Sequence, residues 1–227
     1  MPFFLAYYLL LVDRITIVDN GSTDNTLKII QDAAKAGGPI IRICHSGMTF
    51  WDWDYGLVIR NTIWKKSDYD LIMWSDLDEI IYRPDLREFL ENTDFDIYQT
   101  KGYDMVSRTY PKKGTSILDI KTGQPAGLED KYLIWKKDSG VTSVTTHTIE
   151  TTDENICRGE IKCLHYKYMG VKALVKRAAA IKARVPSNSY CKGIGGNILK
   201  IYPAFVKTER EYIKEIEQRM RESIQIL

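Results

Sequence analysis

The sequence has little of what marks secreted, zinc-binding or membrane-spanning proteins. Its four cysteines are too few and too scattered for a disulfide framework, and none lies in a CxxC pair of the kind that binds zinc. The longest apolar run, MPFFLAYYLLLV, has about a dozen residues, whereas a bilayer-spanning helix needs roughly 20. The run also lacks the basic start and the cleavage site of a signal peptide, so we expect it to be part of the fold of a cytoplasmic protein.

An excess of one charge is missing too. The chain has 32 basic and 30 acidic residues, a net charge of +2 at pH 7, which gives no support to a nucleic-acid-binding surface. Its 227 residues contain no internal repeat and no low-complexity tail. Because a chain of this length can bury a sizeable core, we expect residues 1–227 to form a single domain with a small-molecule partner.

What the sequence does have is an alternation of strand and helix patterns between Arg14 and Ile81. Short runs rich in β-branched residues predict strands, and the segments between them show apolar residues at helical spacing. The order predicts an α/β fold with an open, mostly parallel sheet flanked by helices. The predicted strands are Arg14–Asp19, Ile40–Cys44 and Asp70–Ser75.

The second half is less regular. Residues 108–130 carry Gly and Pro throughout and predict a long loop, either a functional lid or an insertion. A helix is expected over residues 171–184, with a basic face that is usually solvated but could meet a diphosphate or an anionic membrane surface. Residues 206–227 predict a helical C-terminal end. The basic face consists of Lys172, Lys176, Arg177, Lys182 and Arg184, and further strands are expected over residues 131–135, 141–146 and 160–165.

The first predicted strand runs into an unusually polar stretch, IVDNGSTDNT. Asp19 ends the strand, Gly21 permits a tight turn, and the hydroxyls and the carboxylate of the next three residues can cap the following helix. Ligands of open parallel sheets bind beyond the carboxyl ends of the strands, where this stretch lies. Carboxylates there suit the hydroxyls of a ribose or the N–H edge of a base. A strand-to-helix turn with a polar cap is the alternative.

The third predicted strand ends in a second acidic stretch, WSDLDE. Alternation along an extended chain puts Asp76 and Asp78 on one side and Leu77 on the other. Two such carboxylates repel each other unless a positive group lies between them, and Mg²⁺ or Mn²⁺ takes oxygen ligands and shares itself with substrate phosphates. A D-x-D pair alone is a weak signal among 30 acidic residues, but its place after an apolar strand strengthens the prediction of a metal site.

Together, IVDNGSTDNT and WSDLDEII resemble a glycosyltransferase of the GT-A fold, close to glycosyltransferase family 2. Further segments are similar to those of the family: PFFLAYYLLLV before the first motif, GYDMVS after the second, and LEDKYLIW, THT and CLHYKYMG in the later half. The resemblance covers most of residues 2–200. It implies the fold of a nucleotide-diphospho-sugar transferase and the transfer of a sugar from a nucleotide donor.

The resemblance also implies roles for individual residues. The first motif would hold the nucleoside of the donor, and the second motif, with a downstream histidine, would hold Mn²⁺ or Mg²⁺. The implied nucleotide-sugar-binding residues are Asp19, Asn20, Gly21, Ser22, Asp24, Asn61, Asp76 and His147. The implied metal ligands are Asp76, Asp78 and His165. For both histidines, a structural place on a strand is the alternative.

Transfer to a hydroxyl acceptor also needs a base, because the hydroxyl is a poor nucleophile and a carboxylate in reach contributes roughly 10²- to 10⁴-fold. Asp130 falls in the sequence order expected for this carboxylate, with Glu79, Asp104 and Glu129 as rivals. The resemblance implies a UDP-, GDP- or dTDP-sugar donor and inversion at the anomeric carbon. It further implies a glycan, lipid-linked or protein acceptor and a polysaccharide pathway, with possible peripheral contact at the inner face of the membrane.

The sequence departs from the family pattern at its start. Family members normally begin with a further strand and an Asn-Glu pair ahead of the helix that resembles PFFLAYY, whereas here Met1 directly precedes Pro2. In the family, that strand helps to build the wall against which the base lies. The alternative function is therefore a non-catalytic relative that binds a sugar nucleotide or a glycan.

Overall fold

The structure is a computed structural model. It describes residues 1–37, 39–45, 53–112, 114–127, 130–143, 145, 147–184, 190–192, 198–200 and 207–227. The predicted rival base Glu129 lies outside the described residues.

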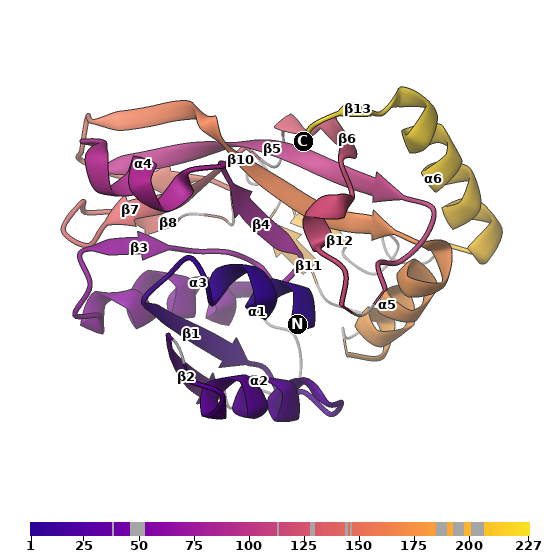
Figure 1. The fold of residues 1–227 in the computed structure, drawn as a ribbon, viewed down its shortest axis with the longest axis horizontal. Coiled ribbons are helices and arrows are strands. Elements are labelled where there is room, and N and C mark those ends of the chain that lie inside the picture. Colours follow the sequence, from indigo (N-terminus) through magenta and orange to yellow (C-terminus); the bar gives the residue numbers. More distant parts are fainter. Residues whose placement is uncertain are drawn as a thin grey trace.

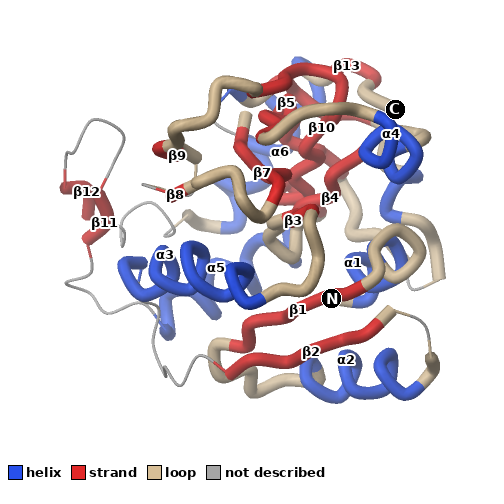
Figure 2. Tube along the Cα trace, turned by 90° about the vertical axis from the view of Figure 1, so that its left-hand side faces the viewer, coloured by secondary structure: helices blue, strands red, loops and turns tan. Residues whose placement is uncertain are grey.

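The N-terminal part is a small α/β layer. It consists of α1 (Pro2–Tyr8), β1 (Arg14–Asp19), α2 (Thr26–Lys35) and β2 (Ile40–His45). The two strands pair in parallel, and α2 lies along them in both views (Figure 1, Figure 2). The helix α1 joins this layer to the rest of the molecule, because the Tyr7 hydroxyl donates to the Ile81 carbonyl at 2.8 Å. The sequence predicted both strands and α2 correctly.

A seven-stranded sheet forms the larger part of the molecule. Its strands, in the order in which they pair, are β13 (Ile224–Gln225), β6 (Thr122–Pro125), β5 (Ile97–Ser107), β10 (Ile156–Met169) and β4 (Glu79–Tyr82). Beside β6, the long strand β5 also pairs with β7 (Lys131–Lys136), which in turn pairs with β3 (Leu71–Met73). The sheet therefore carries both β3 and β4, the strands that flank the second acidic motif.

The α/β class is confirmed, but the prediction of a mostly parallel sheet needs correction. In the described residues β10 and β5 pair in parallel, as β1 and β2 do, and the other pairings of the large sheet are antiparallel. The physical reason is the connections after β5. In the part of this segment that the structure describes, no long crossover helix lies between β5 and β6 or between β6 and β7, and antiparallel neighbours need no such crossover.

The helices cover this sheet and its ends. Two of them, α5 (Val171–Arg184) and α6 (Glu209–Glu222), pack together at one end, where Leu174 contacts the cluster of Tyr212 and Ile216 (Figure 1). Gly170 lets β10 turn into α5, because it has φ +69° and an added Cβ would lie 2.8 Å from the Tyr110 backbone nitrogen. The other elements are α3 (Trp53–Thr62), α4 (Leu86–Asn92), the 3₁₀ helices η1 (Ile63–Lys66) and η2 (Ile117–Asp119), and the strands β8 (Thr142–Ser143), β9 (Ile149–Glu150), β11 (Tyr190–Lys192) and β12 (Ile198–Lys200).

Two segments differ from their predictions. Residues 108–130 are not one long loop, because η2 and β6 lie within them and β6 joins the sheet. The predicted C-terminal helix ends at Glu222, and Ile224 then pairs with Gly123. Within the described residues, no helix is long and apolar enough to span a membrane.

Candidate functional site

The polar stretch after β1 forms a tight loop around one buried carboxylate. The Gly21 N–H donates to Oδ2 of Asp19 at 3.1 Å, and the Ser22 N–H donates to Oδ1 at 3.2 Å. The loop can close because Gly21 adopts φ +70°. The Asp19 side chain is only 3% exposed, so it holds the loop, whereas Asn20 and Ser22 are half-buried and Asp24 is exposed.

The two carboxylates of this loop have backbone partners. Burial would raise the pKa of Asp19, but the hydrogen bonds from Ser22 and Gly21 outweigh it, so that its pKa lies below the ordinary value. Asp24 accepts the N–H of Thr26, the first residue of α2, at 2.9 Å, but the N-cap position is occupied by Asn25, whose side chain makes no cap hydrogen bond, so the predicted cap shifts by one residue. Hydrogen bonds from Thr26 lower the pKa of Asp24, and the charge of Lys176 on α5 adds a smaller effect.

The second acidic stretch lies in a turn between two strands. β3 ends at Met73 and β4 begins at Glu79, whose N–H donates to the Asp76 carbonyl at 3.0 Å. The prediction that the alternation of a strand aligns Asp76 and Asp78 is therefore wrong, because both residues follow the strand. The turn arranges the two carboxylates, and their neighbours differ.

Asp78 faces two groups that carry or can carry positive charge. Its Oδ2 lies 2.5 Å from Nη1 of Arg177 on α5 and 3.3 Å from Nε2 of His165 on β10. Pairing of β4 with β10 places His165 opposite Glu79, next to the turn. Burial would raise the pKa of Asp78, but the hydrogen bond with His165 and the charge of Arg177 outweigh it and hold the pKa below its usual range. This carboxylate is therefore ionised at neutral pH.

Asp76 lies beside a buried ion pair. Lys131 of β7 contacts the Glu79 carboxylate, and their side chains are 6% and 1% exposed. Oε2 of Glu79 also accepts the N–H of Asp76 at 3.1 Å. Asp76 keeps access to solvent, yet partial desolvation and the negative charge of Glu79 raise its pKa to about 6, against the opposing charge of Lys131.

His165 has a carboxylate beside each ring nitrogen. Its Nδ1 lies 3.3 Å from Oδ1 of Asp104 on β5, and Oδ2 of Asp104 lies 3.2 Å from Nη1 of Arg219 on α6. The guanidinium of Arg219 stacks 3.6 Å from the ring centre of Tyr168. A carboxylate behind a histidine is the usual arrangement for a metal-bound imidazole, because it fixes the ring and raises its basicity.

The predicted metal set is only partly assembled. Among the described residues, no three His, Cys, Asp or Glu side chains are placed to hold one metal ion. Asp78 contacts Nε2 of His165, and Asp104 contacts Nδ1 of the same ring. The hydrogen bond of Asp76 is made by its backbone N–H to Glu79, at the end of the same turn. Mg²⁺ and Mn²⁺ are usually held by one or two protein carboxylates plus substrate phosphates, so the present pair fits such an ion.

Two predicted nucleotide contacts serve a neighbouring hairpin. Asn61 of α3 exchanges two hydrogen bonds with the backbone of Ser143 on β8, at 2.9 and 2.8 Å. His147 lies between β8 and β9, and its N–H donates to the Thr145 hydroxyl at 3.0 Å. The structure therefore places Asn61 as a tether for β8. The nucleotide contacts of Asn61 and His147 stay predictions.

The predicted base, Asp130, lies at the start of β7, at an interruption in the pairing of β5. β7 pairs with β5 up to Thr100, β6 takes over at Tyr103, and Oδ1 of Asp130 accepts the intervening N–H of Gly102 at 2.7 Å. Its Oδ2 accepts from Nζ of Lys101 at 2.8 Å. The side chain of Asp130 is 25% exposed, so an acceptor hydroxyl could reach it. Its role as the base stays a prediction.

Several residues near the turn had no role in the sequence-based prediction. Arg60 is buried, donates to the Ser143 hydroxyl at 2.9 Å and lies 5.3 Å from the ring centre of Trp74. Lys131 had no predicted role, since a lone basic residue in a strand gives no local signal, and Arg219 was expected only to pair with Glu215 on its own helix, which it does at 3.6 Å. Arg177 was predicted as part of a basic helix face that could meet a diphosphate or a membrane surface, and its contact with Asp78 was not predicted.

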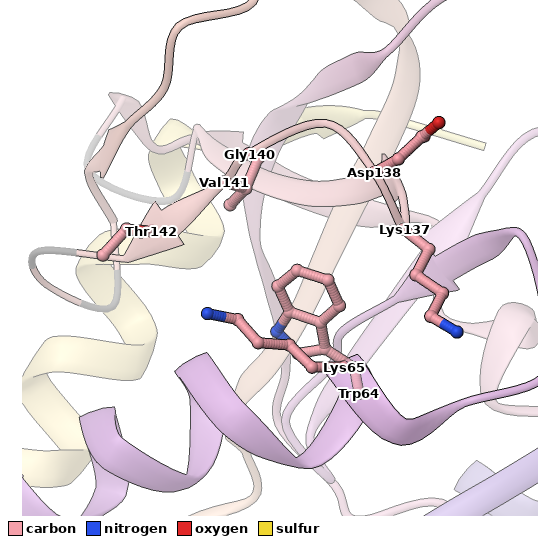
Figure 3. Close-up of a pocket in the computed structure, with 7 residues that line it drawn as sticks. All are labelled: Trp64, Lys65, Lys137, Asp138, Gly140, Val141 and Thr142. Atoms are coloured by element: carbon pink, nitrogen blue, oxygen red, sulfur yellow. The ribbon is translucent and has the colours of Figure 1, made fainter.

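The described surface is hollowed near the acidic turn and also elsewhere. A hollow of about 60 Å³ borders Asp78 and is otherwise lined by apolar and aromatic side chains, among them Phe3, Leu77 and Tyr110. A larger one of about 260 Å³, shown in Figure 3, lies over the indole of Trp64. None of the predicted site residues lines the larger hollow, whereas Asp78 borders the smaller one.

The geometry can be compared with known proteins. The family model described as "Glycosyl transferase family 2" matches residues 9–130, a stretch that holds both acidic motifs. The chain belongs to glycosyl transferase family 2. Its membership confirms the predicted family and, with it, the GT-A fold.

The other comparisons give less. No curated protein matches this family 2 chain significantly. Among solved structures, residues 1–349 of TarS from S. aureus align with a TM-score of 0.41 and 14% sequence identity. The alignment covers 91% of this chain and 61% of the TarS structure.

Proposed function

We propose that this protein is a metal-dependent glycosyltransferase that moves a sugar from a nucleotide donor to a hydroxyl of a glycan, lipid-linked or protein acceptor. The observation that carries the proposal is the turn of Asp76 and Asp78, which lies inside the family 2 match and faces His165. An ionised carboxylate beside an imidazole that is itself backed by Asp104 suits a divalent cation.

Asp78 and His165 would hold the cation, Mn²⁺ or Mg²⁺, with Asp76 close by and Asp104 orienting the imidazole. When bound, such an ion stabilises the negative charge of the departing nucleoside diphosphate as a Lewis acid. Asp104 keeps His165 in one orientation, and Arg219 keeps Asp104 in place through its second oxygen. The negative Asp104 thus lies between the imidazole of His165 and the positive guanidinium of Arg219.

The loop after β1 would bind the nucleoside. Asp19 shapes this loop from within, which leaves Asn20, Ser22 and Asp24 at the surface to meet a ribose or a base. The Lys176 charge acts on Asp24 while Arg177 contacts Asp78, so one helix, α5, reaches both acidic motifs. This supports one continuous donor site along the two motifs.

Asp130 would accept the proton of the acceptor hydroxyl, with attack on the face opposite the leaving group and hence inversion. Its exposure distinguishes it from two rivals, because Glu79 is buried against Lys131 and Asp104 is held between His165 and Arg219. To act as a base, Asp130 must give up its contact with Lys101 and accept a hydrogen bond from the acceptor hydroxyl instead. A UDP-, GDP- or dTDP-sugar as donor, and work in polysaccharide synthesis at the inner face of a membrane, belong to the same proposal.

The test is the binding and turnover of UDP-, GDP- and dTDP-sugars with and without Mn²⁺. We expect Mn²⁺-dependent binding of one donor, release of its nucleoside diphosphate, and loss of both in Asp78→Ala. The matched control is Asp32→Ala on α2, which removes an exposed carboxylate far from the turn along the chain. Unchanged donor affinity of Asp78→Ala in Mn²⁺ would contradict the metal assignment.

One observation favours a second candidate, a non-catalytic relative that binds a sugar nucleotide or a glycan. Both oxygens of Asp130 already have donors, Lys101 and the Gly102 N–H. Donor binding without release of nucleoside diphosphate, for every acceptor class, would support this candidate. Asp130→Asn separates the two, because we expect it to keep donor binding and lose transfer.

A further inference from the structure

The helix α5 is firmly placed beside the acidic turn. Gly170 starts it, and the Gly170 N–H donates to the Ser107 carbonyl at 2.9 Å. Leu174 packs into the cluster formed with Tyr212 and Ile216 of α6. The position of the helix is thus fixed by its apolar side, while its exposed residues Lys176 and Arg177 extend from a rigid base.

Arg177 contacts the same Asp78 oxygen that faces His165, and a divalent cation at this place would need that oxygen. Nη1 of Arg177 lies 2.5 Å from Oδ2 of Asp78, and the same oxygen lies 3.3 Å from Nε2 of His165. A divalent ion bound between Asp78 and His165 would take this oxygen as its ligand. Arg177 and the ion would then be two positive charges on one carboxylate oxygen, and their repulsion makes simultaneous occupation unfavourable.

Arg177 is able to leave. Its side chain is 45% exposed and sits on a long flexible stem, unlike the buried Lys131 beside Asp76, which is 6% exposed. A guanidinium suits phosphate as well as carboxylate, because its planar fork can make two parallel hydrogen bonds to either. A donor diphosphate next to the cation would offer that second partner.

We propose that Arg177 is a donor-responsive residue that neutralises Asp78 before the donor arrives and passes to the donor diphosphate once a cation occupies Asp78. The inference rests on the proposed function and adds to it a residue for diphosphate recognition. Arg177 has opposite effects in the two steps. It competes with free metal for Asp78, and it attracts the nucleoside diphosphate in the presence of metal.

These opposite effects give the test. Mn²⁺ affinity is measured by electron paramagnetic resonance for the protein with Mn²⁺ alone, and the affinities of UDP, GDP and dTDP are measured by calorimetry at saturating Mn²⁺. In Arg177→Ala we expect Mn²⁺ alone to bind about 5- to 10-fold tighter, the gain if the ion pair blocks the site in about 80–90% of molecules. We expect the bound nucleoside diphosphate to lose about 10- to 100-fold in affinity, as for a lost charge-assisted hydrogen bond.

Two further variants support the test. Lys214→Ala removes one exposed positive charge from α6 and should change neither affinity. Arg177→Lys keeps the charge but not the fork, so we expect Mn²⁺ binding as in the wild type and weaker diphosphate binding. If circular dichroism shows that Arg177→Ala does not fold, Arg177→Lys provides the test of diphosphate binding instead.

The outcomes separate the inference from the proposed function. Wild-type protein that binds none of the three nucleotides overturns both. Wild-type binding with unchanged Mn²⁺ and nucleotide affinities in the Arg177 variants overturns the role of Arg177 alone. Weaker binding of Mn²⁺ and of nucleotide together in Arg177→Ala also overturns it, because a merely structural contact would lower both.

Discussion

Asp76 and Asp78 belong to one turn, yet the positively charged residues near them differ in burial. Around Asp76 the positive charge comes from Lys131, whose ion pair with Glu79 is buried and belongs to the framework of the sheet. Around Asp78 it comes from Arg177, whose side chain is 45% exposed and can move. The difference indicates that the positive partner near Asp76 is fixed by burial, while the positive partner of Asp78 can be displaced from the surface.

The strongest way to sharpen this comparison is to remove the fixed charge. Lys131→Met leaves Glu79 buried and unpaired, so we expect the free energy of unfolding to fall by about 3–5 kcal/mol. The matched change Lys101→Met breaks the more exposed pair with Asp130 and should cost no more than about 1 kcal/mol. Urea denaturation measures both. Equal losses would contradict a special role for the buried pair.

A smaller effect is expected from Asp104, whose carboxylate lies 3.3 Å from Nδ1 of His165. Asp104→Asn should weaken Mn²⁺ binding by about 10- to 100-fold, because a neutral amide orients the imidazole less firmly and lowers its basicity. Asp94→Asn, in an exposed pair with Lys136, is the control. Mn²⁺ titration followed by electron paramagnetic resonance gives both affinities. An unchanged Mn²⁺ affinity of Asp104→Asn would reduce Asp104 to a packing role.

The smallest effect concerns the loop after β1, where backbone N–H groups of Gly21 and Ser22 hold the Asp19 carboxylate and Nδ1 of His45 lies 3.5 Å from its Oδ2. The folded-state pKa of Asp19 lies below its unfolded value, so the stabilisation is complete above about pH 4 and is lost as pH falls towards the folded pKa. Asp19→Asn should therefore destabilise the protein by about 1 kcal/mol at pH 7 and by less at pH 3.

Urea denaturation of Asp19→Asn and wild type at these two pH values checks the sign. A loss that grows as the pH falls would mean that the ionised carboxylate does not hold the loop. Asp19→Asn should also weaken nucleoside binding, because it loosens the loop. The control Asp32→Asn on α2 should change neither the stability nor the nucleoside affinity.

Local patterns were sufficient for most elements. The runs rich in β-branched residues gave β1 and β2, the helical spacing of Val171–Arg184 gave α5 with its observed bounds, and the motifs gave a family that the comparison confirmed. The exceptions are segments whose state depends on distant partners. β6 lies in a Gly- and Pro-containing stretch, and it is a strand because β5 has a free edge there.

The site shows the same division. The sequence by itself determined where the acidic motifs lie and which ligand classes they suit, because turn residues and carboxylates after apolar strands are local signals. Only the tertiary structure decided that Asp78 meets Arg177 and His165, that Asp76 sits beside Lys131, and that Asp130 faces Lys101. These partners lie from 29 to 99 residues apart in the chain, and charge acts through space regardless of that separation.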